Sequence, residues 1–136
     1  MDFISINELR DILDQTQSAE LLRGKSATLE YAEKSNPICI GTYDGELGCV
    51  AGFVIPTFMS DRAYIWFCTT EVVDAHKVSF ARGVKRAKNI MQGIYPQIIG
   101  HCVENSSSVI WLKSLGAIFT ETHNGLVKFI IEANNG

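Results

Sequence analysis

Residues 105–119 have the sequence Asn-Ser-Ser-Ser-Val-Ile-Trp-Leu-Lys-Ser-Leu-Gly-Ala-Ile-Phe, which predicts a turn, a short helix and the start of a strand. Asn105 and the serines after it are residue types whose side-chain oxygens cap helix starts. The helix is predicted over Val109 to Leu115. Gly116 ends it, because glycine adopts the left-handed conformation of a helix end without strain.

Strands are predicted on both sides of this helix. Ile98 to Val103 is apolar and precedes the serines, while Ile118 to Thr122 and Leu126 to Ile131 follow the helix. The last two flank Asn124-Gly125, a dipeptide that favours a two-residue hairpin turn. The chain therefore closes with a β-hairpin.

Upstream lie a strand and a long helix. Ala63 to Thr69 is a mostly apolar, aromatic run that suits a central strand covered on both faces. Val78 to Tyr95 has helical periodicity, and Pro96 stops it. The apolar positions of this helix are Phe80, Val84, Ala87 and Met91. Its solvent face would carry Lys77, Arg82, Lys85, Arg86 and Lys88.

The first part of the chain predicts two helices and a short extended piece. Ser5 or Asn7 can cap a helix that runs to about Gln15. A second helix covers Ser18 to Arg23, with Gly24 placed to end it, and a short extended piece is expected over Ala27 to Tyr31.

A hairpin follows this helical part. Pro37 opens a strand over Ile38 to Tyr43, Asp44-Gly45 is a strong hairpin signal, and Leu47 to Ile55 is the partner strand. We therefore expect a single α/β domain over residues 1–136, with a mixed, mostly antiparallel sheet of about six or seven strands and helices on both faces.

Composition limits the function classes. The chain has 136 residues, 46% of them hydrophobic, and a net charge of −3, so no global attraction to nucleic acid is expected. The first residues lack the basic and apolar regions of a signal peptide, and no stretch approaches the roughly 20 apolar residues of a membrane span.

The histidines and cysteines do not predict a metal centre. His76, His101 and His123 are far apart in the sequence, and the cysteines form no Cys-x-x-Cys pair. We expect four buried, reduced thiols, at Cys39, Cys49, Cys68 and Cys102, and hence a reducing cytoplasm.

The element order and the stretch Asn105 to Phe119 resemble the GNAT (Gcn5-related N-acetyltransferase) family. More narrowly, the Trp66 to Thr70 segment, the basic helix and the same stretch resemble the small GNAT-like proteins of T7-type podophages, the internal virion protein A group. The family resemblance implies acetyl-CoA as a cofactor. The narrower one implies a role in virion morphogenesis, in the host cytoplasm and the virion.

The resemblance implies that backbone amides at the start of the long helix bind the CoA pyrophosphate, within a Gln/Arg-x-x-Gly-x-Gly/Ala loop. The matching residues are 76–81, in which Ser79 replaces the first glycine and only Ala81 agrees. The serine hydroxyl can still bind phosphate, and Lys77 and Arg82 supply charge, so binding is weakened rather than excluded. The implied cofactor-binding positions are Phe67, Cys68, Thr69, His76, Lys77, Ser79, Ala81, Arg82 and Asn105.

The resemblance also implies an acid, commonly a tyrosine seven residues after the asparagine, and Leu112 occupies that position here. Leucine has no proton to donate. Glu71 and Glu104 are candidate bases, although carboxylates at strand ends are usually solvated or cap a turn. The five cations of the long helix either bind phosphate or form a solvated face.

Three hypotheses follow from these residues. The first is a phage GNAT-fold protein that acts through contacts with other virion proteins or a host protein. The second is an acetyl-CoA-dependent N-acetyltransferase, and the third is a host-directed inhibitor. Nucleic acid is not expected as a partner, and the sequence does not determine the oligomeric state.

Overall fold

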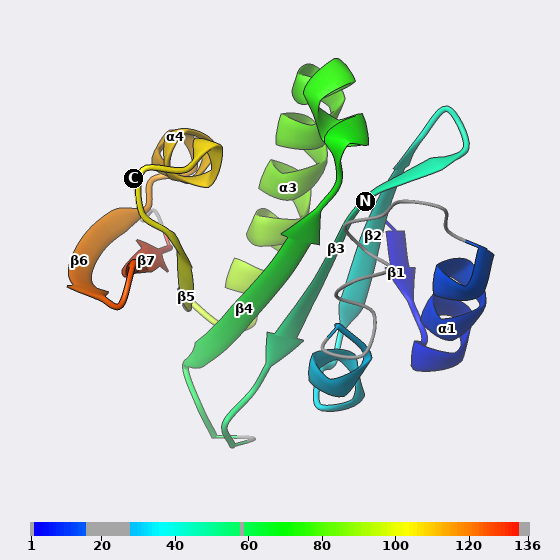
Figure 1. The fold of residues 1–136 in the computed structure, drawn as a ribbon. Coiled ribbons are helices and arrows are strands. Elements are labelled where there is room, and N and C mark those ends of the chain that lie inside the picture. The colour runs from blue at the N-terminus through cyan, green and yellow to red at the C-terminus, as the bar shows by residue number, and fades with distance from the viewer. Residues whose placement is uncertain (1, 16–27, 58, 134–136) are drawn as a thin grey trace. The chain divides into compact units, whose positions relative to one another are not determined.

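The computed structural model describes residues 2–15, 28–57 and 59–133 (Figure 1). Seven strands form one sheet in the order β1-β2-β3-β4-β5-β7-β6. The elements, in chain order, are β1 (Asp2–Ile4), α1 (Ile6–Gln15), β2 (Ile38–Tyr43), β3 (Glu46–Val54), β4 (Arg62–Thr69), η1 (Glu71–Ala75), α3 (Lys77–Gln92), β5 (Gln97–Val103), α4 (Ser107–Ser114), β6 (Ile118–His123) and β7 (Leu126–Glu132).

The chain divides into two compact units. The first contains Met1–Val54 and Trp66–Val84, and the second contains Ile55–Ile65 and Lys85–Gly136. Strand β4 and helix α3 therefore each supply residues to both units. The units are described separately below.

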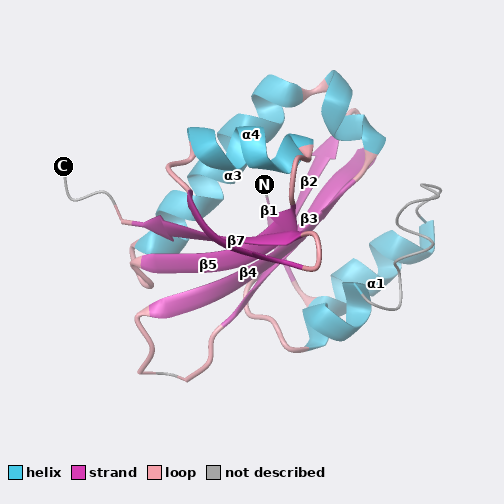
Figure 2. Ribbon diagram, turned by 60° about the vertical axis from the view of Figure 1, so that its left-hand side comes forward, coloured by secondary structure: helices cyan, strands magenta, loops and turns pink. Residues whose placement is uncertain are grey.

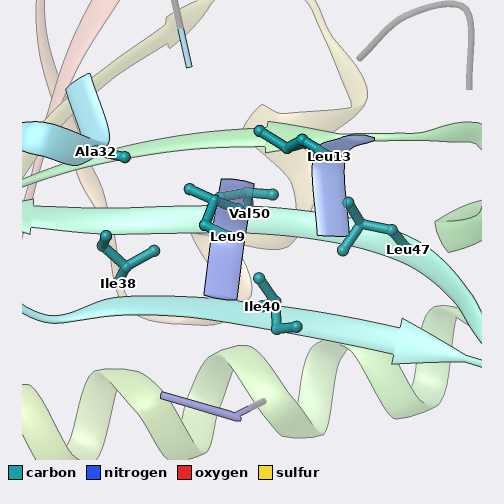
Figure 3. Packing of buried hydrophobic residues seen from close by; sticks show 7 residues of the cluster. All are labelled: Leu9, Leu13, Ala32, Ile38, Ile40, Leu47 and Val50. Carbon is teal, nitrogen blue, oxygen red and sulfur yellow. The ribbon is translucent and has the colours of Figure 1, made fainter. Parts of the chain in front are cut away.

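In the first unit, α1 packs its apolar stripe on β2 and β3. Leu9 and Leu13 are fully buried, and Figure 3 shows them among side chains of the two strands. Ser5 begins the helix, since its hydroxyl accepts a hydrogen bond from Glu8 N at 3.1 Å. The buried cluster consists of Leu9, Leu13, Ala32, Ile38, Ile40, Leu47 and Val50.

Strands β2 and β3 form the predicted hairpin. Asp44 has φ 54° and Gly45 has φ 80°, the left-handed pair that a two-residue turn of this kind requires. The antiparallel register runs from Ile38 opposite Gly52 to Tyr43 opposite Glu46, with an irregularity between Gly41 and Thr42. The β2 boundaries match the prediction.

For the start of the chain, one prediction is wrong and one strand was not predicted. Residues 28–33 are helical rather than extended, because Thr28 and Ala32 are buried four residues apart on one helical face. Strand β1, which pairs antiparallel with β2, was not predicted because three largely exposed residues carry no periodic pattern. The predicted helix over Ser18 to Arg23 lies outside the described residues.

The second unit contains one parallel and two antiparallel strand pairs. Residues Arg62 to Tyr64 of β4 pair in parallel with Gln97 to Ile99 of β5. Strand β5 then pairs antiparallel with β7, which lies beside it in Figure 2. Strand β7 pairs antiparallel with β6. Phe129, on β7, is fully buried. The fold class predicted from the sequence, a mixed and mostly antiparallel sheet with helices, is confirmed.

The remaining boundaries differ from prediction by a few residues. Helix α3 ends at Gln92 rather than Tyr95, because Gly93 follows and the next amides turn back to Asn89, Ile90 and Met91. Its predicted apolar face is confirmed, with Phe80, Ala87 and Met91 buried. Strand β4 is central, as predicted, but less covered than expected, because Trp66 to Thr69 are only half-buried.

A search of the described helices for a membrane span found none that is both long and apolar enough to cross a bilayer.

Gly52 provides a test of the packing in the first unit. A Cβ at this position would lie 2.5 Å from Cε2 of Trp66, so Gly52→Ala forces the indole to move. We expect the free energy of unfolding in urea to fall by about 1–3 kcal/mol. Gly93→Ala is the matched control. The nearest neighbour of a Cβ on Gly93 would be Ile90 O at 3.3 Å, so this substitution should lower the free energy of unfolding clearly less. Equal losses of unfolding free energy in the two variants would contradict the close packing of Trp66 on Gly52.

Candidate functional site

The segment between β4 and α3, residues 70–76, is anchored to β3 at its start. We call it the β4–α3 connection. Thr70 is buried, its amide donates to Gly48 O at 2.7 Å, and its hydroxyl donates to Leu47 O at 2.8 Å. The same hydroxyl accepts from Val72 N at 3.3 Å and so caps η1. Thr70 therefore fixes where the connection leaves the sheet.

The end of the connection contacts the β2–β3 turn. The ring of His76 stacks on Tyr43, with centroids 5.3 Å apart and planes 15° apart. Its Nε2 lies 3.4 Å from Oδ2 of Asp44. Asp44 is largely exposed, so solvent screens this pair and the stack contributes more to holding His76.

Helix α3 begins with three exposed residues whose amides have no acceptor within the helix. The first helical bond runs from Phe80 N to His76 O at 2.9 Å, which leaves the amides of Lys77, Val78 and Ser79 without a helical partner. All three residues are exposed. These donors, at the positive end of the helix dipole, suit an anion.

The charges of α3 favour the same kind of ligand. Its first turn contains no acidic residue, and Lys77 lies where a cation opposes the helix dipole. A bound anion would relieve that repulsion. Of the five cations predicted on the solvent face, Lys77, Arg82, Lys85 and Arg86 are exposed and Lys88 is half-buried.

The other candidates of the first unit flank this helix start. Phe67, Cys68 and Thr69 are half-buried at the end of β4. Glu71 is exposed as the first residue of η1, directly after the capping Thr70. Ala81 and Arg82 are exposed on α3. The structure thus places Thr69 and Glu71 at the start of one short connection and His76 at its end.

The second unit contains the remaining candidates. Glu104 and Asn105 are exposed in the turn between β5 and α4, and Asn105 has φ 60°. Glu104 N donates to Gly125 O at 3.0 Å, which ties this turn to the β6–β7 hairpin. Helix α4 then begins at Ser107, with Ser106 as its cap residue.

Leu112 belongs to the apolar core of the second unit. It is 2% exposed, and its carbonyl accepts hydrogen bonds from Leu115 N and Ala117 N at the end of α4. The position at which the resemblance implies an acid is therefore occupied by a buried packing residue. Its side chain cannot transfer a proton.

The cysteines do not form a nucleophilic or metal-binding group. Cys39, Cys49 and Cys102 are buried and free as predicted, whereas Cys68 is only half-buried. Burial raises the pKa of Cys39 to about 12 and that of Cys49 to about 11, so both remain thiols at neutral pH. Within the described ranges, no three His, Cys, Asp or Glu side chains are placed to hold a metal ion.

Sequence reasoning missed the residues that hold the helix start in place. From the sequence, Tyr43 and Asp44 are recognised only as hairpin residues, and Thr70 only as the end of the Trp66 to Thr70 segment. The available signal was a threonine directly before an acidic residue at a strand end, which is typical of a helix cap. The contact between Tyr43 and His76 joins residues far apart in sequence and has no local pattern.

The fold of this chain is similar to that of several acetyltransferases of known structure. The S5-alanine acetyltransferase of Vibrio fischeri matches with a TM-score of 0.67 and 10% identity, over 98% of this chain and 92% of that one. An IAA acetyltransferase from Bacillus cereus matches at 0.65 and 12%, over 96% and 97%. A ribosomal L7/L12 alpha-N-protein acetyltransferase, solved in complex with coenzyme A, matches at 0.65 and 11%, over 96% and 90%.

These matches and the strand order show that the chain has the GNAT fold. No protein-family model matches the sequence, and no curated protein matches it. At identities of 10–12% the solved structures establish the fold and leave the activity to be argued from the residues.

Proposed function

We propose that this chain is an acetyl-CoA-dependent N-acetyltransferase. The observation that carries the proposal is the exposed start of α3, where the amides of Lys77, Val78 and Ser79 lack helical partners. The fold supports it, because the solved structures that share it are acetyltransferases, one of them in complex with coenzyme A.

The residues at the start of α3 fit the phosphates of CoA. Three accessible amides point along the helix axis, Lys77 adds a positive charge, and no carboxylate in the first turn competes. Ser79 carries a side chain where the family pattern has glycine. Because Ser79 is exposed, its side chain is free to turn toward solvent and its hydroxyl can bind a phosphate oxygen.

Bound acetyl-CoA would supply an activated acetyl thioester. In the transfer, the amine nitrogen bonds to the acetyl carbon and the carbon–sulfur bond breaks. We assign to the Glu71 carboxylate the proton that the amine loses, because Glu71 is exposed directly after β4 and is held there by Thr70. Leu112 has no proton to give to a leaving thiolate, so that proton would come from water.

The absence of an acid at Leu112 predicts slow turnover. General acid catalysis typically contributes about 10²–10⁴-fold to a rate. A chain without it retains the contributions of binding and of the base, so we expect acetyl transfer that is measurable but weak.

Leu112 and Ser79 also favour a second function, a binding role without turnover. The resemblance to small podophage proteins suggests that this role is in virion morphogenesis, through contacts with other virion proteins or a host protein. It differs from the first function in two observables. The protein would be present in purified particles, and acetyl transfer would be absent.

Binding of acetyl-CoA tests the cofactor site. We expect isothermal titration calorimetry to give a micromolar dissociation constant, accompanied by a rise in melting temperature. Lys77→Ala should weaken binding about 10-fold, the effect of losing a charge-assisted hydrogen bond. Lys88→Ala removes the same charge from a half-buried position on α3 and should have little effect. Equal losses from both variants would indicate only general charge attraction.

Acetyl transfer tests the base. With a panel of amines as acceptors, Glu71→Gln should lower kcat by about 10²-fold or more, because the amide cannot accept the proton. Glu104→Gln tests the other candidate base, an exposed carboxylate at the end of another strand, and should leave the rate unchanged if Glu71 is the base. Full activity of Glu71→Gln would remove Glu71 from the mechanism.

A further inference from the structure

The β4–α3 connection has no core of its own. None of the five residues of η1 is buried, and Glu71, Asp74 and Ala75 are exposed. A short 3₁₀ helix without buried side chains does not hold a fixed position by itself. Contacts with residues outside the connection must therefore hold the start of α3 in place.

The β2–β3 hairpin supplies that hold at both ends of the connection. At the first end, Thr70 is hydrogen-bonded to the backbone oxygens of Leu47 and Gly48. At the other end, His76 stacks on Tyr43 from the same hairpin. His76 is the last residue before α3, and its carbonyl accepts the first helical hydrogen bond.

Tyr43 is itself fixed by the strands on which it lies. A Cβ on Gly48 would come within 2.5 Å of the Tyr43 ring, so the ring lies directly over this glycine. The Tyr43 hydroxyl is hydrogen-bonded to the thiol of Cys49. The ring therefore presents one face to His76 from a rigid pair of strands.

We propose that the β2–β3 hairpin positions the start of α3 for phosphate binding, with Tyr43 as the positioning residue that acts through His76. This inference rests on the proposed function and adds a positioning residue to its cofactor site. Amide donors at a binding site must be held to within roughly 0.5 Å of their working geometry. The stack and the Thr70 hydrogen bonds provide that restraint.

The test compares two ligands on variants of the whole chain. Tyr43→Leu removes the ring and should weaken binding of CoA about 10-fold, while pantetheine, which has no phosphate, should bind as it does to the unmodified protein. Tyr43→Phe keeps the ring over Gly48 and should retain CoA binding. Equal weakening of CoA and pantetheine by Tyr43→Leu would overturn the proposal.

Tyr31→Leu is the matched control for a lost aromatic stack. Tyr31 stacks on Trp66 in the same unit, with centroids 6.0 Å apart, and neither residue lies in the connection. This variant should leave CoA binding unchanged. Thr70→Val removes the two hydroxyl hydrogen bonds at the other end of the connection and keeps the amide bond to Gly48 O. It should reproduce the loss that is selective for CoA, which provides a second test if Tyr43→Leu does not fold.

Amide hydrogen exchange tests, without any ligand, whether the β2–β3 hairpin restrains the β4–α3 connection. The amides of Val73 and His76 are hydrogen-bonded within the connection, to Thr70 O and Val73 O. They should exchange at least several-fold faster in Tyr43→Leu and at the original rate in Tyr31→Leu. Unchanged exchange in Tyr43→Leu would overturn the positioning role. If exchange is faster in Tyr43→Leu but the unmodified protein binds no CoA, the hairpin does restrain the connection and the proposed function is refuted.

Discussion

The candidate site depends on one constraint. The β2–β3 hairpin holds both ends of the β4–α3 connection in place. Thr70 is bonded to β3 at one end, and His76 is stacked on Tyr43 at the other. Between them lies a 3₁₀ helix with no buried residue. A buried hydroxyl with a good hydrogen bond and an aromatic stack are each modest interactions, but together they fix the ends of a five-residue element that could not fix itself.

The proposed acetyltransferase activity makes two separate demands on this arrangement. Phosphate binding requires donors held in place, and the start of α3 has them in Lys77, Val78 and Ser79. Proton transfer requires titratable groups, and the proposed site has few of them. Glu71 is exposed, and Leu112, at the position where the resemblance implies an acid, is buried. Under the proposed function, the chain would therefore bind acetyl-CoA well and transfer the acetyl group slowly.

Much of the fold follows from local pattern. Asp44-Gly45 between two apolar runs predicts a hairpin because few other residues adopt its left-handed turn, and β2 has the predicted bounds. The helical spacing of Phe80 and Met91 likewise predicts the buried face of α3. Short elements such as β1 and η1 escape prediction because their residues repeat too few times to show a period. The role of Tyr43 escapes it because the contact with His76 depends on the tertiary fold.

The most direct test of the central claim is a titration of the isotopically labelled protein with CoA, followed residue by residue by amide chemical shifts. The account predicts that the largest shifts occur at the amides of Lys77, Val78 and Ser79, because these are the donors without helical partners. Saturable binding that leaves these three amides unshifted, or an absence of any shift at millimolar CoA, would contradict it.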